Sequence, residues 1–412
     1  MRAKVYSVPM TTATQSSSPV SQFFTRIGDN IGRWPTKYIF LFFMALAAVI
    51  ACVSWGQSQD MTLHTRYNNF VIFKHSFFHL IHNQDLYTFY QPEYYDLYKY
   101  SPSFALCMGV FAWLPDLPAL ILFNVANAVV LIIAVRKLPF SQKNLNIFLL
   151  LILIETMISF TSSQVNALIT GLLVLAWYFL ENDKPWWATL LIVITFYIKI
   201  FGIVGLALCL LYPSRWKSAL ATICWIIVIG IMPLLVVSPG QLLFLYKSWG
   251  TLLSHDHGAS VGVSLYGWWH TWFGFNMNKQ WFVLIGALLF CLPLLRVGSW
   301  PQPVYRLHML ASVLIWVVIF NHKGESPTYV IAMAGIGIWY YTQAPTRSNL
   351  VLLLLALVFT SFSSTDLITP YKVARTWVEP YAVKAVFCSI IWFKLIWDLT
   401  FGKLVPRMEL KA

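Results

Sequence analysis

Long apolar runs alternate with short polar interruptions along most of the chain. The runs are about 14 to 22 residues long, close to the length that a helix needs to cross a bilayer, whereas barrel strands would alternate over segments of about ten residues. We therefore predict an all-α, polytopic helical membrane protein with about twelve spans. The predicted spans cover residues 36–56, 117–135, 145–160, 165–181, 185–198, 200–212, 218–237, 281–295, 307–320, 327–342, 349–362 and 381–399.

The polar intervals divide the chain into three parts. Residues 1–34 are Ser/Thr-rich and are predicted to form a disordered cytoplasmic leader. A transmembrane domain follows over residues 35–402, and residues 403–412 form a second cytoplasmic tail. The domain has two long polar intervals, a first outer loop at 57–116 and a large outer loop at 238–280.

The first outer loop contains two apolar stretches that we predict to lie at the membrane interface. In residues 68–82, Phe70, Phe73 and Phe77 fall on one helical face, and His75 and His79 fall on the opposite face, which we interpret as solvated. Residues 103–114 are too short to span a bilayer. Counting them as a span would also place the basic residues that follow residue 135 on the outer side, whereas basic residues normally stay on the cytoplasmic side.

A single lysine interrupts the apolar stretch from 185 to 212. A lone lysine in mid-membrane is costly. Two short helices that meet at Lys199 would instead put its ammonium group at the outer surface and return the next basic residues to the cytoplasm. We therefore predict that the helix breaks at Lys199.

Composition and charge agree with this class of protein. The chain is 58% hydrophobic and only 10% charged, too apolar for a soluble protein of this size. Its net charge of +13 does not indicate nucleic-acid binding, because the basic residues punctuate the apolar runs and form no stripe. Their distribution places both termini in the cytoplasm. The six cysteines lie in apolar segments without metal-like spacing.

Several short motifs then appear in a characteristic order. They are Arg66-Tyr67-Asn68-Asn69-Phe70, Asp85-Leu86-Tyr87, Tyr100-Ser101-Pro102-Ser103-Phe104-Ala105-Leu106, Leu114-Pro115, Asn124, Gln164-Val165-Asn166-Ala167-Leu168 and Lys199. In this order and spacing the chain resembles glycosyltransferase family 87, over most of residues 60–220.

The resemblance implies an α-mannosyltransferase-like enzyme of the GT-C superfamily. Such an enzyme moves a hexose, for example mannose, from a polyprenyl-phosphate carrier to a lipid or glycan acceptor, with inversion at the anomeric carbon. It implies a multi-pass protein of the bacterial inner membrane, active on the extracytoplasmic side. Its expected partners are the lipid-linked donor, the acceptor and membrane lipids, with no nucleic acid; no cofactor is expected, and a divalent metal is not favoured.

The reaction needs a cation for the departing phosphate and a base for the acceptor hydroxyl. We expect Lys199 to bind the phosphate, assisted by Arg66 and Lys323. The family usually has an aspartate where this chain has Asn69, and a carboxamide cannot act as a base. Asp60, early in the first outer loop, and Asp96 are therefore the candidate catalytic residues.

The remaining candidates are polar residues of the predicted outer segments. We expect substrate contacts from Asn69, Lys99, Tyr100, Gln164, Asn166, His257 and His322. His75 and His79 have helical spacing suited to a metal, but a solvated helix face is the simpler interpretation, and no metal ligands are predicted.

Two other functions remain open on sequence alone. A lipid or polyprenyl-linked sugar transporter or flippase would need polar residues in mid-membrane, and Glu155 is the main feature in its favour. A catalytically silent relative that binds a lipid-linked sugar is the second, because Asn69 replaces the usual acid.

Overall fold

The computed structural model describes residues 30, 32, 34–59, 65–91, 93–255, 261–321, 324–365 and 369–402. Most of the predicted leader and the whole tail at 403–412 lie outside these residues. So do four candidate site residues, namely Asp60, His257, His322 and Lys323.

The described residues form helices and turns and contain no strand, which confirms the all-α prediction. The helices of the first half are α2 (Thr36–Gly56), α3 (Asn68–Ile81), α4 (Pro102–Cys107), α5 (Gly109–Ala112), α6 (Asp116–Val135), α7 (Gln142–Leu151), α8 (Leu153–Thr161), α9 (Asn166–Glu181), α10 (Pro185–Ile198), the 3₁₀ helix η1 (Ile200–Leu211), α11 (Arg215–Ile231) and η2 (Met232–Leu235). Those of the second half are α12 (Pro239–His255), α13 (Leu265–Phe273), α14 (Lys279–Cys291), η3 (Leu292–Leu295), η4 (Val297–Ser299), α15 (Pro303–Ile319), η5 (Ser326–Thr328), α16 (Tyr329–Thr342), α17 (Arg347–Ala356), η6 (Leu357–Ser361), η7 (Phe362–Ser364), α18 (Tyr371–Val373), η8 (Ala374–Val378) and α19 (Val383–Thr400).

Several helices have the length and composition of membrane spans. Among the described residues, four are long and apolar enough by themselves, at 37–56, 116–135, 215–235 and 347–364. The pair α7 and α8 makes a fifth if it is one bent span. Other apolar helices of 10–17 residues include α9, α10, η1 and α15. A membrane protein is therefore supported, while the count of twelve spans stays a prediction.

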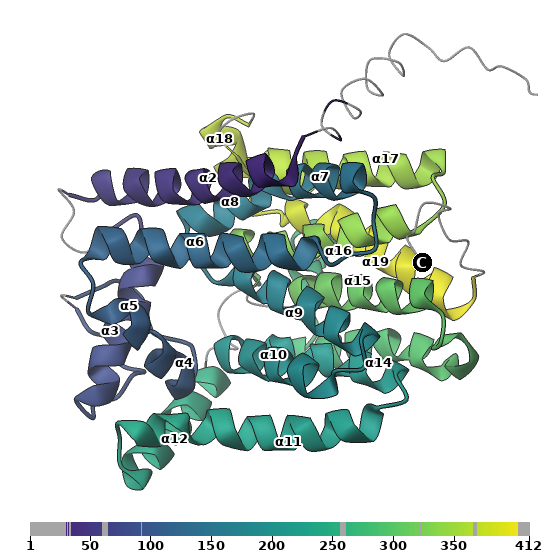
Figure 1. Cartoon of the computed structure of the whole chain (residues 1–412). Coiled ribbons are helices and arrows are strands. Elements are labelled where there is room, and N and C mark those ends of the chain that lie inside the picture. Colours follow the sequence, from purple (N-terminus) through teal and green to yellow (C-terminus); the bar gives the residue numbers. More distant parts are fainter. Residues whose placement is uncertain are drawn as a thin grey trace, which may run out of the picture.

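The long helices lie side by side, and α3, α4 and α5 gather at one end of them, where α12 also lies (Figure 1). Helices α15 and α16 form the centre of the bundle. Nearly every residue of α16 is buried, as expected for a helix that is apolar on all sides. The loops at the end that carries α3–α5 hold most of the candidate site residues.

The interval 238–280, predicted as the large outer loop, contains two helices, α12 and α13. Helix α12 is held to the first outer loop, because the Ser248 hydroxyl donates to both carboxylate oxygens of Asp85 at 2.9 Å. The Gln241 amide also donates to the carbonyl of Asn83 at 2.9 Å. These hydrogen bonds fix α12 against the segment that follows α3.

The structure differs from the sequence-based expectation in three local details. The expected helix at 103–114 is two short helices, α4 and α5. The expected span at 145–160 is bent by 45° between α7 and α8. His79, expected on a solvated face, is buried with 4% of its surface exposed, because Tyr90 stacks on its ring at 3.7 Å.

The predicted break at Lys199 is confirmed. Lys199 has extended backbone angles between α10 and η1, so the residue interrupts the helix and is not part of one continuous span. Gly202 lets η1 pack tightly on α10, since a Cβ at this position would lie 2.3 Å from the Thr195 hydroxyl. The η1 segment continues with 3₁₀ geometry for twelve residues, far longer than is usual for this type of helix.

Candidate functional site

A large cavity of about 1090 Å³ is lined by α3, by the segment before α4 and by residues of η1, α12, α14 and α15. Its wall combines polar groups from several loops with apolar side chains from η1, α14 and α15. The polar part includes Asn69, Asp96, Lys99, Tyr100, Gln164, Lys199 and Glu325. The apolar part includes Ile200, Phe201, Ile203, Val204, Val283, Val317 and Phe320. A cavity with these two kinds of wall suits an amphiphile, one end of which is charged and the other apolar.

Lys199 lies at the junction of the polar and apolar walls. Its ammonium group donates to Gln164 Oε1 at 3.1 Å and to Asn166 Oδ1 at 3.0 Å. An ammonium group has three donors, and Lys199 forms these two hydrogen bonds with the residues that the structure describes. Lys199 therefore has one N–H available for a ligand in the cavity.

The pKa of Lys199 reflects the same position. Burial disfavours the charged ammonium and lowers the pKa from its ordinary value. The Glu325 carboxylate opposes this effect, and the Lys99 charge adds to it. An anion that enters the cavity would favour the ammonium form in the same way as Glu325, so the site is electrostatically suited to a negative group.

Gln164 joins Lys199 to Glu325. Its side-chain carbonyl accepts from Lys199 and from the Asn166 amide at 2.7 Å, while its amide donates to Glu325 Oε2 at 2.6 Å. Because the lysine needs an acceptor and the carboxylate needs a donor, only one orientation of the Gln164 amide satisfies both. The turn before α9 thus fixes the positions of both charged groups.

Glu325 reaches this network through a close backbone contact. The Gly324 carbonyl accepts from the Val263 backbone N–H at 2.7 Å, so the segment before η5 lies against the segment before α13. A Cβ at Gly324 would lie 2.4 Å from the Val263 carbonyl oxygen. A glycine is therefore required here to bring Glu325 to the cavity.

Asp96 is the second carboxylate of the cavity wall. Its φ of 85° is in the left-handed region, which aspartate tolerates better than most residues. One carboxylate oxygen accepts from the Leu97 N–H at 2.7 Å, and the Lys99 ammonium lies 3.2 Å from the carboxylate. The side chain remains 48% exposed, so a substrate hydroxyl can reach it.

Asn69 and Tyr100 complete this side of the cavity. The Asn69 amide donates to the Ser162 carbonyl at 2.8 Å, which ties α3 to the turn before α9. Tyr100 is buried, and burial raises the pKa of its phenol, with Glu325 and Asp96 adding to the shift. Its ring lies beneath the Lys199 ammonium, 5.9 Å away. Both residues shape the wall that holds the charged groups.

The structure thus brings together most of the predicted site residues that it describes. Two of them do not line the cavity. Arg66 is exposed outside it, and its backbone N–H donates to the Ser58 hydroxyl at 2.7 Å. Asn166 is fully buried behind Lys199 and supports its ammonium group.

Glu325 is a candidate that sequence reasoning left out. It belongs to the segment His322 to Pro327, which has a charged pair between two apolar runs, but nothing local links it to Gln164. The contact joins positions 161 residues apart in the chain. The available signals were the expectation that both segments lie on the outer side and the choice of His322 and Lys323 from the same segment.

A second charged group is buried deeper in the bundle. The Lys384 ammonium lies 2.9 Å from the Glu155 carboxylate and donates to the Ser326 hydroxyl at 2.9 Å. The side chains of Lys384 and Glu155 are 3% and 0% exposed. Glu155, the feature that favoured a transporter, is therefore held in an ion pair that links α8, η5 and α19.

One of the comparisons with known proteins finds a match. A search of curated proteins finds no match. The model of glycosyltransferase family 87 matches residues 98–370, about two thirds of the 412-residue chain, including Lys99, Gln164, Lys199 and Glu325. This match covers most of the helices and loops that form the cavity, and the chain therefore belongs to glycosyltransferase family 87.

Proposed function

We propose that the chain transfers a hexose from a polyprenyl-phosphate carrier to a lipid or glycan acceptor, as an inverting enzyme of the GT-C type. We place the reaction at the outer face of a bacterial inner membrane. The observation that carries the proposal is the cavity, where Lys199 lies between polar and apolar walls. A lipid phosphate needs this combination, because its charge requires a cation and its tail requires an apolar surface.

In the proposed reaction, a carboxylate of the first outer loop takes the proton of the acceptor hydroxyl. The hydroxyl oxygen then forms a bond to the anomeric carbon, and the bond from that carbon to the phosphate oxygen breaks. The electron pair leaves with the polyprenyl phosphate, and the Lys199 ammonium stabilises its charge. The proton stays on the carboxylate until solvent removes it. We propose Asp96 or Asp60 as this base.

The direct test is a transfer assay with the purified full-length chain in lipid nanodiscs. Polyprenyl phosphates that carry different labelled hexoses are the donors, and lipid and glycan fractions of a bacterial envelope are the acceptors. We expect label in a product larger than the donor sugar. Binding of the donor without transfer would indicate a catalytically silent relative. Movement of the donor across a vesicle membrane without transfer would indicate a flippase.

The two candidate bases are separated by isosteric variants. We expect one of Asp96→Asn and Asp60→Asn to lower kcat by about 100-fold or more, because general base catalysis contributes 10²–10⁴ and an amide cannot accept the proton. Donor binding should persist in the inactive variant. Full activity in both variants would remove both candidates. Glu325→Gln, assayed alongside, tests the remaining carboxylate of the described cavity wall.

The close contact at Gly324 provides a second test in the same assay. We expect Gly324→Ala to lower the transfer rate by about 100-fold, because the new Cβ meets the Val263 carbonyl and displaces Glu325 and the groups bound to it. Gly250→Ala is the matched control, since a Cβ there meets nothing within 4 Å. Equal rates in the two variants would show that the position of Glu325 does not matter.

A further inference from the structure

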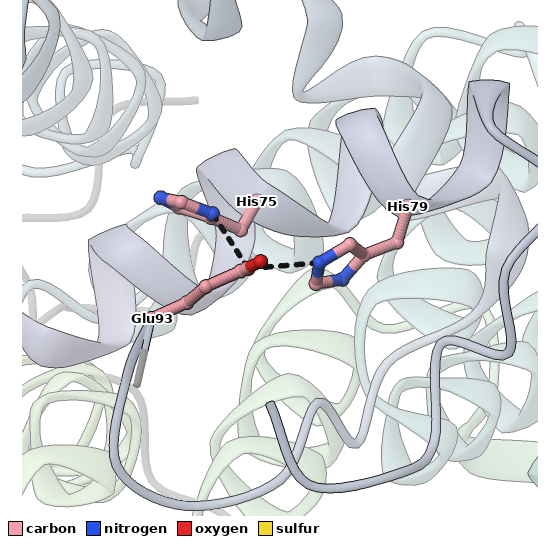
Figure 2. Close-up of side chains that lie close together, drawn as sticks. All are labelled: His75, His79 and Glu93. Carbon is pink, nitrogen blue, oxygen red and sulfur yellow. Dashed lines mark hydrogen bonds and ion pairs between the residues drawn. The ribbon is translucent and has the colours of Figure 1, made fainter. Parts of the chain in front are cut away.

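Three potential metal ligands lie together on the first outer loop, outside the cavity wall (Figure 2). His75 and His79 are one turn apart on α3, and Glu93 comes from the segment that follows it. Glu93 Oε2 lies 2.9 Å from His75 Nδ1 and 2.8 Å from His79 Nε2. One atom of each residue lies within 4.8 Å of the other two.

The two rings are oriented by the surrounding residues. Figure 2 shows a nitrogen of each imidazole directed at the Glu93 carboxylate. Tyr90 stacks on the His79 ring at 3.7 Å, and the Tyr94 ring lies 6.0 Å from His75. His79 Nδ1 has no hydrogen-bond partner among the described residues. When a metal binds Nε2, the hydrogen bond from Nε2 to Glu93 is replaced by two bonds to the metal, and the ring proton moves to Nδ1.

Two imidazoles and one carboxylate are a ligand set typical of Zn²⁺. Metal–ligand distances of about 2.0–2.2 Å in a tetrahedral site place the ligand atoms about 3.4 Å apart, so the Glu93 oxygen would withdraw from the two nitrogens and the three side chains would adjust their positions. The side chains of His75 and Glu93 are 35% and 38% exposed. Solvent can thus enter the site and supply the fourth ligand, usually a water molecule in a three-residue site.

We propose that His75, His79 and Glu93 form a zinc site that fastens the segment from Asp85 to Tyr100 to α3. None of the three residues lines the cavity, so the metal has a positioning role and is not part of the reaction. The fastened segment carries Asp96, Lys99 and Tyr100 to the cavity wall. The sequence-based expectation was a chain without a metal. That expectation considered His75 and His79 without Glu93, because the sequence does not show that Glu93 lies next to them.

The test uses the purified full-length chain after treatment with a chelator. Zinc is titrated by calorimetry, and bound metal is counted by mass spectrometry. We expect one zinc ion per chain. His75→Gln and Glu93→Gln should each weaken binding by more than about 100-fold, because loss of a mere second-shell partner already costs 10–100-fold. His82→Gln is the control, since it removes a nearby exposed histidine that is outside the cluster.

A second measurement separates metal binding from folding. Thermal unfolding of the metal-free proteins should be similar in wild type and in Glu93→Gln, because glutamine retains a hydrogen-bonding side chain of the same size. Added zinc should stabilise wild type and His82→Gln alone. Absence of stoichiometric zinc in wild type, or wild-type affinity in both ligand variants, would overturn the site. These readouts do not depend on sugar transfer, so the proposed function can fail while the zinc site stands, and the reverse.

Discussion

Replacing Lys199 with methionine is expected to lower the rate of sugar transfer by about 100- to 1,000-fold, the usual cost of losing one group that stabilises developing charge. The ammonium group is the charged donor at the junction of the polar and apolar walls of the cavity. It is held by Gln164 and Asn166 and retains one N–H for the phosphate. The effect should appear mainly in kcat, because the phosphate gains charge as the sugar leaves.

The control for this variant is Lys247→Met, which makes the same chemical change on the exposed surface of α12. It should transfer sugar at the wild-type rate. Because Lys199→Met leaves the buried Asn166 Oδ1 without its lysine donor, while Gln164 Oε1 keeps the Asn166 amide, thermal unfolding must be measured alongside. A folded Lys199→Met protein with wild-type kcat would contradict the assigned role.

Replacing Lys384 with methionine is expected to lower the free energy of unfolding by about 3–5 kcal/mol, the cost of leaving one partner of a buried ion pair uncompensated. Glu155 is fully buried, and Lys384 is its charged partner in the described structure. Unfolding by a denaturing detergent, followed by tryptophan fluorescence, gives this difference. Because Lys384 also bonds Ser326, the residue after Glu325, a loss of transfer activity should accompany it.

A double variant distinguishes the loss of charge pairing from a general packing defect. Glu155→Leu combined with Lys384→Met should recover most of the lost stability, because an apolar pair of similar volume often equals a buried ion pair. Arg375→Met, which breaks the exposed pair with Glu379, should change stability by less than about 1 kcal/mol. A stable Lys384→Met protein would mean that the pair does not contribute to the fold.

The fold class and most helix positions could be predicted because they depend on local pattern. The bounds of α2 and α10 match the predicted spans, since a proline marks the start of each helix and Lys199 marks the end of α10 in the sequence itself. The break at Lys199 was predictable from the cost of a lysine in lipid. The bend between α7 and α8 was not, because Ile152 lies in an unbroken apolar run with no proline or glycine.

The candidate site was predictable residue by residue but not as a network. Lys199, Gln164 and Asp96 could each be chosen from residue type and expected side of the membrane. The partners that orient them come from distant segments. The Gln164–Glu325 contact spans 161 residues and the Glu155–Lys384 pair spans 229. The role of Glu93 depends on a turn that brings it back over α3, and periodicity along α3 carries no information about that turn.

The length of the 3₁₀ helix η1 determines how far the apolar wall of the cavity extends. A 3₁₀ helix has three residues per turn and rises about 2.0 Å per residue, so η1 spans about 24 Å where an α-helix of equal length would span about 18 Å. Ile200 and Ile203 form one row along the cavity, and Phe201 and Val204 form a second. One inserted residue would turn both rows by about 120°. The number of residues in η1 therefore determines how far the helix extends from Lys199. It also determines which apolar side chains face the cavity, as much as residue type does.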